Sequence, residues 1–212
     1  MSEIRAAYLA AADSAAALLG DAAVARCWAA PSALPEFGVR GLAGHLAAQV
    51  LRVRPLLADP VPQEPPIPLL EHYARGRWLG AGLDDEANVG IRRAGEEAAG
   101  PEAAVLSRRV ARAADELRAA LPAEPADRVV HLPWGPWSLR LDDFLLTRMM
   151  EIAVHSDDLA VSVGVSTPVL PSAVLEPVLD LLARLAVRRH GATALLRALS
   201  RAERAPASVS AL

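Results

Sequence analysis

Apolar residues recur every three or four positions along most of this chain, which is the spacing of helices that bury one face. The pattern predicts four long helices, over residues 3–20, 39–58 and 101–121 and from a cap at Asp142 or Asp143 to about Gly164. Further helices are predicted over residues 69–79, 84–100, 171–190 and 192–203. Most of the chain is therefore expected to be helical.

Prolines and capping residues set the expected limits of these helices. Pro55 should kink the second long helix or bend its last turn, and Pro101 suits the first turn of the third. Asp84 lies near the expected N-cap of the helix over residues 84–100. The proline-rich residues 59–68 are expected to form an extended connector, because they cannot continue a helix.

One segment departs from the helical pattern. Residues 129–141, VVHLPWGPWSLRL, alternate around a Pro-Trp-Gly-Pro turn, which predicts a β-hairpin. The predicted fold class is therefore all-α. We expect an antiparallel four-helix bundle with a short β-hairpin before the fourth long helix and extra C-terminal helices.

The composition favours helices and makes several kinds of partner unexpected. Apolar residues make up 53% of the chain and aromatic residues only 4%, because alanine and leucine dominate. The net charge of −3 comes without a basic block, so we expect no nucleic-acid partner. No apolar run reaches the ~18 residues of a membrane span. Glu3, Arg5 and Asp13 come too early for a signal peptide.

The single cysteine indicates a compartment. Cys27 has no second cysteine to pair with, so an internal disulfide is excluded and a reducing compartment is expected. Its apolar neighbours favour a buried small hydrophobic residue over a nucleophile. We therefore expect a cytoplasmic protein.

The stretch RMMEIAVHSDDLA, residues 148–160, carries polar residues at helical spacing inside an otherwise apolar helix. Arg148, Glu151, His155 and Asp158 share one face. Glu151 and His155 leave the helix one turn apart, and a carboxylate and an imidazole at this spacing suit a divalent metal ion. Burial of Glu151 without a cation would be costly, so we expect the face to line a site.

A third ligand must come from another part of the chain. The candidates are His45, His72, His131 and His190. His45 is favoured because it lies in the middle of an apolar helix, among small residues that let another helix approach. Gln49 and Arg52 continue the same face.

Simpler interpretations stay open beside this one. Arg148 and Glu151 could form an exposed ion pair that adds little stability. A lone buried histidine is more often a core residue with satisfied hydrogen bonds than a metal ligand.

Four motifs, in this order, carry a resemblance to a known family. They are W-x-x-P-S-A-L (28–34), G-L-A-G-H-L (41–46), P-W-G-P-W-S-L (133–139) and T-R-M-M-E-I-A-V-H-S-D-D-L (147–159). The set resembles the N-terminal domain of the mycothiol-dependent maleylpyruvate isomerases of actinobacteria, within the DinB-like bundle superfamily. The resemblance covers residues 3–165. It implies a DinB-like bundle over residues 1–165, and a C-terminal helical extension, residues 166–212, is expected to pack on it.

The resemblance implies a metal and a thiol cosubstrate. Its divalent metal, zinc most often and nickel or iron as alternatives, would be held by His45, Glu151 and His155. An open position on the metal would admit mycothiol, a low-molecular-weight thiol. The metal would lower the pKa of that thiol, so that a thiolate exists near neutral pH.

The resemblance also gives neighbouring residues hypothetical roles. Arg148 and Arg52 would hold a carboxylate of the substrate or thiol, with ion pairing as the alternative. Asp158 would orient an imidazole, with a structural hydrogen bond as the alternative. Gln49, Trp134 and Tyr73 are expected to line the cofactor pocket, although an aromatic residue at a hairpin turn is more often there for packing.

The expected function is S-transfer to a small electrophile, or its thiol-assisted isomerisation. The isomerases carry a C-terminal α/β domain, which the helices predicted over residues 166–212 replace here. Alternatives are a non-catalytic DinB-like protein that binds a small molecule or a partner, and a metal-dependent hydrolase at the same site. A homodimer is a further expectation, since the apolar face of the helix over residues 171–190 could pack on the bundle or on a second subunit.

Overall fold

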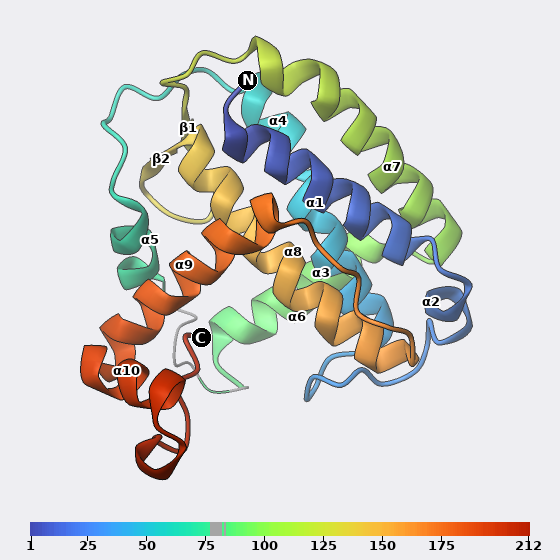
Figure 1. Cartoon of the computed structure of the whole chain (residues 1–212). Helices are drawn as coiled ribbons and strands as arrows, with labels where there is room; N and C mark the ends of the chain where they lie inside the picture. Colours follow the sequence, from blue (N-terminus) through green and yellow to red (C-terminus); the bar gives the residue numbers. More distant parts are fainter. Residues whose placement is uncertain (77–81, 83) are drawn as a thin grey trace.

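The computed structural model describes residues 1–76, 82 and 84–212, and its core is a bundle of four long helices (Figure 1). The four are α1 (Glu3–Leu19), α3 (Val39–Leu51), α7 (Ala103–Ala120) and α8 (Leu141–Val163). Helices α1 and α8 run in one direction and α3 and α7 in the other, so that α3 lies antiparallel to α8. The predicted all-α class and antiparallel bundle are confirmed.

Buried apolar side chains from all four helices fill the bundle. They include Tyr8, Leu42, Leu46, Leu106, Leu117, Leu145 and Met149, each almost fully enclosed. Such burial of one face per helix is the main stabilising contribution in a bundle of this kind.

The ends of α1 and α7 are tied together by a buried arginine. Arg5 donates to Asp142 at 2.8 Å and to the main-chain oxygen atoms of Leu121, Glu124 and Pro125. This contact explains one difference from the sequence prediction. Helix α8 begins at Leu141 with Arg140 at its N-cap, and Asp142 lies inside the first turn because its carboxylate binds Arg5.

The second predicted long helix is interrupted before its proline. Helix α3 ends at Leu51 and α4 (Val53–Ala58) follows directly. The break at Arg52 places Pro55 in the first turn of α4. N–H groups in a first turn make no hydrogen bond within the helix, so the lack of one on Pro55 costs α4 nothing. The break falls in the turn before the proline, as expected for a helix that a proline kinks, because Pro55 has no N–H to donate to the Leu51 oxygen.

Two helix starts also differ from the prediction. Helix α7 begins at Ala103 with Glu102 at its N-cap, so that Pro101 precedes the helix. Helix α6 (Glu86–Ala99) is capped by Asp85, whose carboxylate accepts from the Ala87 N–H at 2.9 Å, instead of by the neighbouring Asp84.

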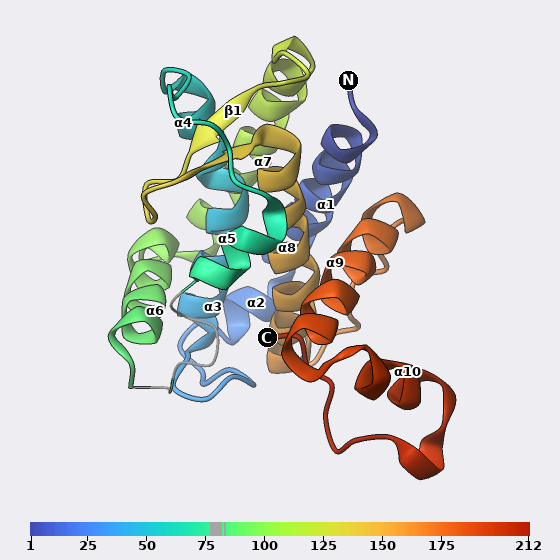
Figure 2. The same cartoon turned by 90° about the vertical axis from the view of Figure 1, so that its left-hand side faces the viewer.

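Shorter elements surround the bundle (Figure 2). A short helix not predicted from the sequence, α2 (Ala22–Arg26), follows α1, and Cys27 at its end is only partly buried against the core. Helix α5 (Leu69–Arg75) ends within the predicted 69–79, and residues 77–79 lie outside the described chain. The hairpin pairs β1 (Val129–His131) with β2 (Ser138–Arg140), as predicted. The 3-10 turns are η1 (Leu121–Ala123) and η2 (Ala202–Arg204).

The C-terminal helices are α9 (Ser172–His190) and α10 (Ala192–Ser200). Helix α9 packs on α1 and α8, and it buries Val178 and Leu185 within the same chain. No helix in the described part of the chain is long and apolar enough to span a membrane.

Candidate metal centre

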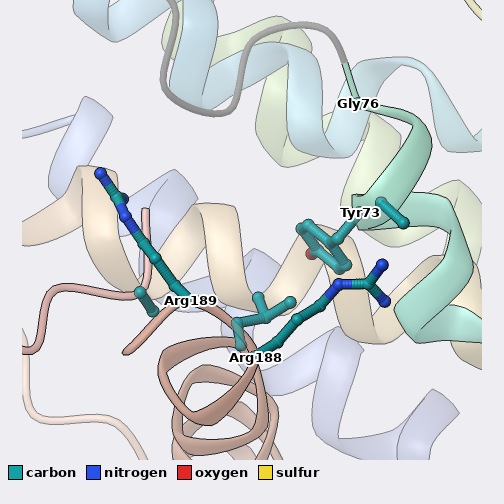
Figure 3. A pocket seen from close by; sticks show the side chains of 7 residues that line it. Tyr73, Gly76, Arg188 and Arg189 are labelled. Atoms are coloured by element: carbon teal, nitrogen blue, oxygen red, sulfur yellow. The ribbon is translucent and has the colours of Figure 1, made fainter. Parts of the chain in front are cut away.

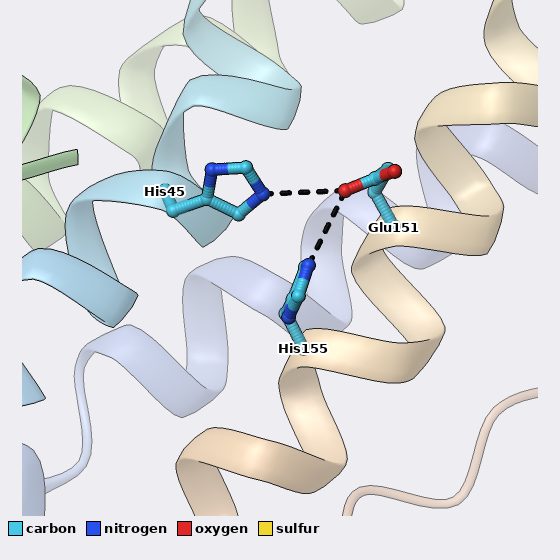
Figure 4. A group of neighbouring side chains, drawn as sticks. All are labelled: His45, Glu151 and His155. Atoms are coloured by element: carbon cyan, nitrogen blue, oxygen red, sulfur yellow. Dashed lines mark hydrogen bonds and ion pairs between the residues drawn. The ribbon is translucent and has the colours of Figure 1, made fainter. Parts of the chain in front are cut away.

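Two antiparallel helices bring the candidate ligands together (Figure 4). His45 projects from the middle of α3, and Glu151 and His155 project from the facing turns of α8. The Nε2 atom of His45 lies 3.2 Å from Oε2 of Glu151, and the Nε2 atom of His155 lies 3.3 Å from the same oxygen. The two imidazole rings meet edge to face, 4.6 Å apart.

The three side chains fit a divalent metal ion. Their ligand atoms all lie within 4.8 Å of one another, in a partly buried position. A tetrahedral zinc ion with bonds of ~2.1 Å separates its ligand atoms by roughly 3.4 Å, close to the two separations above. Two imidazole nitrogens and one carboxylate oxygen form a donor set that zinc binds well and that nickel and iron also accept. Within the described residues this is the one group of histidine, cysteine and acidic side chains that could hold a metal ion.

The protonation of the three groups follows from their contacts. Burial lowers the pKa of His45, so its imidazole is neutral near pH 7 and able to ligate. Burial alone would raise the pKa of Glu151, but its hydrogen bonds with His155 and His45 hold it well below its ordinary value. Burial would also lower the pKa of His155, yet hydrogen bonds with Asp158 and Glu151 raise it to about 9.

Asp158 holds the second ring nitrogen of His155. Its Oδ2 atom lies 2.9 Å from Nδ1 of His155, one helical turn further along α8. A carboxylate on the far nitrogen of a histidine fixes the ring orientation and leaves Nε2 facing the ligand group. Asp158 therefore contacts His155 in the structure, and its orienting role stays a prediction.

Arg148 lies one turn before Glu151 and is buried. It donates to Oε1 of Gln49 at 2.5 Å and to Oγ1 of Thr147 at 3.0 Å. Gln49 in turn donates to the His45 main-chain oxygen at 2.8 Å. Arg148 has no carboxylate partner among the described residues, and Glu151 pairs with His45 and His155 instead. The alternative interpretation, an ion pair between Arg148 and Glu151, is therefore wrong. Its charge still acts on Glu151 through space.

The hairpin tryptophan completes this side of the site. The guanidinium groups of Arg148 and Arg52 lie 5.5 Å and 5.9 Å from the centre of the Trp134 ring. The guanidinium group of Arg148 also lies 5.4 Å from the centre of the Phe144 ring. Two cations and one aromatic surface thus gather beside the candidate metal ligands.

Tyr73 lies on α5 and is 2% exposed. Its hydroxyl has no hydrogen-bond partner among the described residues. It is close enough to the site for the charge of Glu151 to act on its pKa.

The other three histidines lie apart from the triad. Nδ1 of His72 accepts from the indole of Trp137 at 3.0 Å, His131 pairs with Glu64 at 3.0 Å on the hairpin, and His190 contacts the Ser210 oxygen. Sequence reasoning missed Thr147 and Phe144, which hold Arg148. Helical spacing could have indicated both, because Phe144 lies four residues before Arg148 and Thr147 lies four residues before Glu151 on α8.

One comparison with known proteins gives a match. The family model described as the mycothiol maleylpyruvate isomerase N-terminal domain matches residues 8–160. Those residues include the three candidate ligands, all of α3 and α7, and most of α1 and α8. Neither the search of curated proteins nor the search of solved structures found a match.

Proposed function

The chain belongs to the mycothiol maleylpyruvate isomerase N-terminal domain family, with a DinB-like fold, and we propose that it is a metal-dependent enzyme that uses a low-molecular-weight thiol. The thiol is mycothiol. The reaction is S-transfer to a small electrophile, or its thiol-assisted isomerisation. The convergence of His45, Glu151 and His155 from two helices is the observation that carries this proposal.

In the proposed site these three residues hold a divalent ion, zinc by preference. Such an ion would supply Lewis-acid chemistry, because it would lower the pKa of a thiol so that a thiolate could form near neutral pH. His45 would supply a neutral nitrogen near pH 7 without first losing a proton, because burial lowers its pKa. Asp158 keeps the Nδ1 side of His155 occupied, so that the ring presents Nε2 to the ion.

The thiolate sulfur attacks an electron-poor carbon of the substrate. In S-transfer a leaving group departs with its electron pair. In isomerisation the sulfur adds to a double bond, the adduct rotates about the resulting single bond, and the sulfur leaves again. Arg148 and Arg52 would bind an acidic group of the substrate or of the thiol, and the closeness of both guanidinium groups to one Trp134 ring supports this role.

Gln49 and Trp134 then have supporting parts in binding. Gln49 accepts from Arg148 and donates to the His45 main chain, so it couples the position of the cation to that of a ligand. Trp134 offers a flat apolar wall next to both arginines.

Metal content and thiol binding test the proposal together. Purified wild-type protein reconstituted with zinc should hold one ion per chain, and His45→Ala and Glu151→Ala should hold none. His131→Ala is the matched control, because His131 is exposed on the hairpin and pairs with Glu64. Mycothiol should raise the thermal-unfolding midpoint of the zinc-loaded protein and leave the chelated protein unchanged.

Two outcomes would overturn this function. Wild-type protein without stoichiometric metal after reconstitution would exclude any metal-dependent reaction at this site. Metal binding without a response to mycothiol would exclude the thiol and leave hydrolysis or simple binding at the same ion.

A further inference from the structure

Helix α10 exposes its large apolar side chains to solvent. None of its nine residues is buried, and the helix stands away from the four-helix bundle (Figure 2). Leu196 is 65% exposed and Leu199 is 78% exposed. Folded proteins bury most of their leucine side chains, so two exposed leucines on one short helix indicate a surface that another molecule covers.

The two leucines lie on the side of α10 that faces away from α9. Helix α10 packs on α9, and its partly buried residues are Ala194, Leu195 and Ala198. At about 100° per residue, Leu196 and Leu199 project from the other side of the helix. Arg197 lies next to Leu196, at the opposite edge from Leu199. The free side of α10 therefore combines two leucines with a cation.

The charges around this side of α10 are almost all positive. From residue 184 to residue 212 the chain has six arginines and one acidic residue, although its net charge is −3. The acidic residue, Glu203, pairs with Arg204. Four further arginines are exposed and form no ion pair within the described chain, namely Arg188, Arg189, Arg197 and Arg201.

Arg188 and Arg189 spread positive charge to both sides of α9. Their side chains extend in opposite directions from the last turn of the helix (Figure 3). Arg188 extends toward α5, where it donates to the Leu70 main-chain oxygen at 3.3 Å. Because the two guanidinium groups do not converge, they suit a partner whose negative charge is spread over a surface better than a single bound anion.

We propose that the surface formed by α10 and the last turn of α9 binds an anionic lipid bilayer. Leu196 and Leu199 enter the interfacial layer of the bilayer, and the arginines lie against its acidic head groups. Helix α10 has nine residues, far fewer than the ~20 of a spanning helix, so it lies in the plane of the bilayer surface.

A bilayer fits this surface better than other occupants do. A second copy of the chain would bring the arginines of both copies together in a symmetric contact, where like charges repel. An acidic protein would need a groove that receives the protruding helix. A bilayer needs no such groove, since its negative charge is spread over a surface and its interior accepts leucine side chains.

The proposed contact is separate from the candidate metal centre. All of its residues lie beyond residue 160, outside the part of the chain that the family model matches. Binding to lipid would therefore be a property of the C-terminal helices of this chain. It does not depend on the proposed function, and zinc-loaded and chelated protein should bind lipid equally.

Co-sedimentation of the full chain with lipid vesicles tests the proposal. One set of vesicles contains phosphatidylcholine alone, and the other contains equal parts of phosphatidylcholine and phosphatidylglycerol. We expect at least about tenfold stronger binding to the anionic vesicles at low ionic strength, and weaker binding as salt is added.

A pair of leucine substitutions tests the apolar part of the contact. Leu196→Ser with Leu199→Ser leaves the net charge unchanged and should weaken binding to the anionic vesicles at least about tenfold. Val61→Ser with Val89→Ser is the matched control. These valines are 51% and 45% exposed and lie far from α10 in sequence, so their substitution should leave the affinity unchanged.

A pair of arginine substitutions tests the charged part. Arg197→Gln with Arg201→Gln should weaken binding roughly twentyfold, since one arginine near an anionic surface contributes about fivefold. Arg93→Gln with Arg112→Gln changes the net charge equally. Arg93 and Arg112 each lie near a glutamate on their own helices, α6 and α7, so this control should bind like the wild type.

Several results would overturn the proposal. Equal binding to neutral and anionic vesicles would exclude recognition of acidic head groups. Full affinity in the leucine variant would show that these side chains do not enter the lipid. An equal loss in the two arginine variants would reduce the effect to net charge. Absence of binding to both kinds of vesicle would leave an acidic protein as the partner of this surface. None of these results bears on whether the triad binds zinc.

Discussion

His155 lies between two carboxylates, with Glu151 on its Nε2 side and Asp158 on its Nδ1 side. The first is a candidate metal ligand and the second fixes the ring. We expect Asp158→Asn to weaken zinc binding by about tenfold to a hundredfold, because the substitution removes the charge that orients His155 and makes it a better ligand. Competition with a chromogenic chelator measures this affinity.

Asp157 supplies the control for this prediction. It is the neighbouring residue, it is exposed, and it accepts from the Thr167 hydroxyl at 2.5 Å instead of contacting a histidine. Asp157→Asn should keep the wild-type zinc affinity. Equal affinities for Asp158→Asn and Asp157→Asn would show that Asp158 is structural only.

His72 predicts a specific pH dependence of stability. Burial, with a smaller effect of the Arg148 charge, lowers the pKa of His72 to about 4 in the folded protein. The unfolded chain takes up this proton near pH 6.5 and the folded chain only near pH 4, so the free energy of unfolding falls as the pH drops through that window. Between pH 7 and 5 this one group should account for a loss of about 2 kcal/mol.

Chemical unfolding of the chelated protein at several pH values measures that loss. His72→Asn retains an acceptor near the position of Nδ1 for the Trp137 indole and does not titrate in this range. Its stability should therefore fall less steeply than that of the wild type from pH 7 to 5. Parallel profiles for the two proteins would refute the assignment to His72.

The grouping of His45, Glu151 and His155 could be predicted from the sequence, because helical spacing fixes which residues of α8 share a face. The lack of a hydrogen-bond partner for the Tyr73 hydroxyl among the described residues could not be predicted from the sequence. Whether its hydroxyl finds an acceptor depends on how a short helix, reached through a proline-rich connector, rests on the bundle. Spacing within one helix contains no information about such a contact.

At the level of elements, the contact between α3 and α6 is made by glycines. A Cβ atom on Gly44 would overlap the main-chain oxygen of Gly95, and one on Gly95 would overlap the oxygen of Gly41. The two backbones therefore approach closely at this crossing. Gly44 precedes His45, so the same crossing sets the position of a candidate metal ligand.

We expect Gly44→Ala to destabilise the protein by roughly 2–4 kcal/mol, because α6 must move away from α3, and to weaken zinc binding. Gly90→Ala on α6 is the control, since a Cβ atom there meets nothing within 4 Å. It should leave zinc binding unchanged and stabilise the helix by up to about 1 kcal/mol. Thermal unfolding and chelator competition on both variants measure the two effects, and a Gly44→Ala variant as stable as Gly90→Ala would rule out the close crossing.

Element types were predictable from apolar spacing, whereas several element limits were not. Asp142 has the chemistry of an N-cap, but it pairs with Arg5, more than a hundred residues away in sequence. Pro55 was expected to kink its helix, and the break at Arg52 follows from the N–H that the proline lacks for the Leu51 oxygen. At Asp142 a tertiary contact overrides the local preference, whereas at Pro55 the local chemistry decides where the helix breaks.

For the whole molecule, the question is whether residues 166–212 are an appendage or part of the core. Helix α9 lies along α1 and α8, and Val174, Val178 and Leu181 are each at most 1% exposed. A helix that buries such a row of side chains contributes to the same core as the bundle. The bundle over residues 1–165 should therefore depend on α9 for its stability.

Two leucines on α9 test this dependence without deleting a helix. Leu181 is 1% exposed and Leu179 is 59% exposed. Leu181→Ala should lower the free energy of unfolding by roughly 2–5 kcal/mol, because it leaves a cavity between α9 and the bundle. Leu179→Ala should change it by no more than about 0.5 kcal/mol. If α9 and the bundle unfold together, urea should cause one cooperative transition. Its midpoint should move to a lower urea concentration in Leu181→Ala. A separate early transition, affected by Leu181→Ala while the main one stays in place, would instead make the C-terminal helices an independent unit.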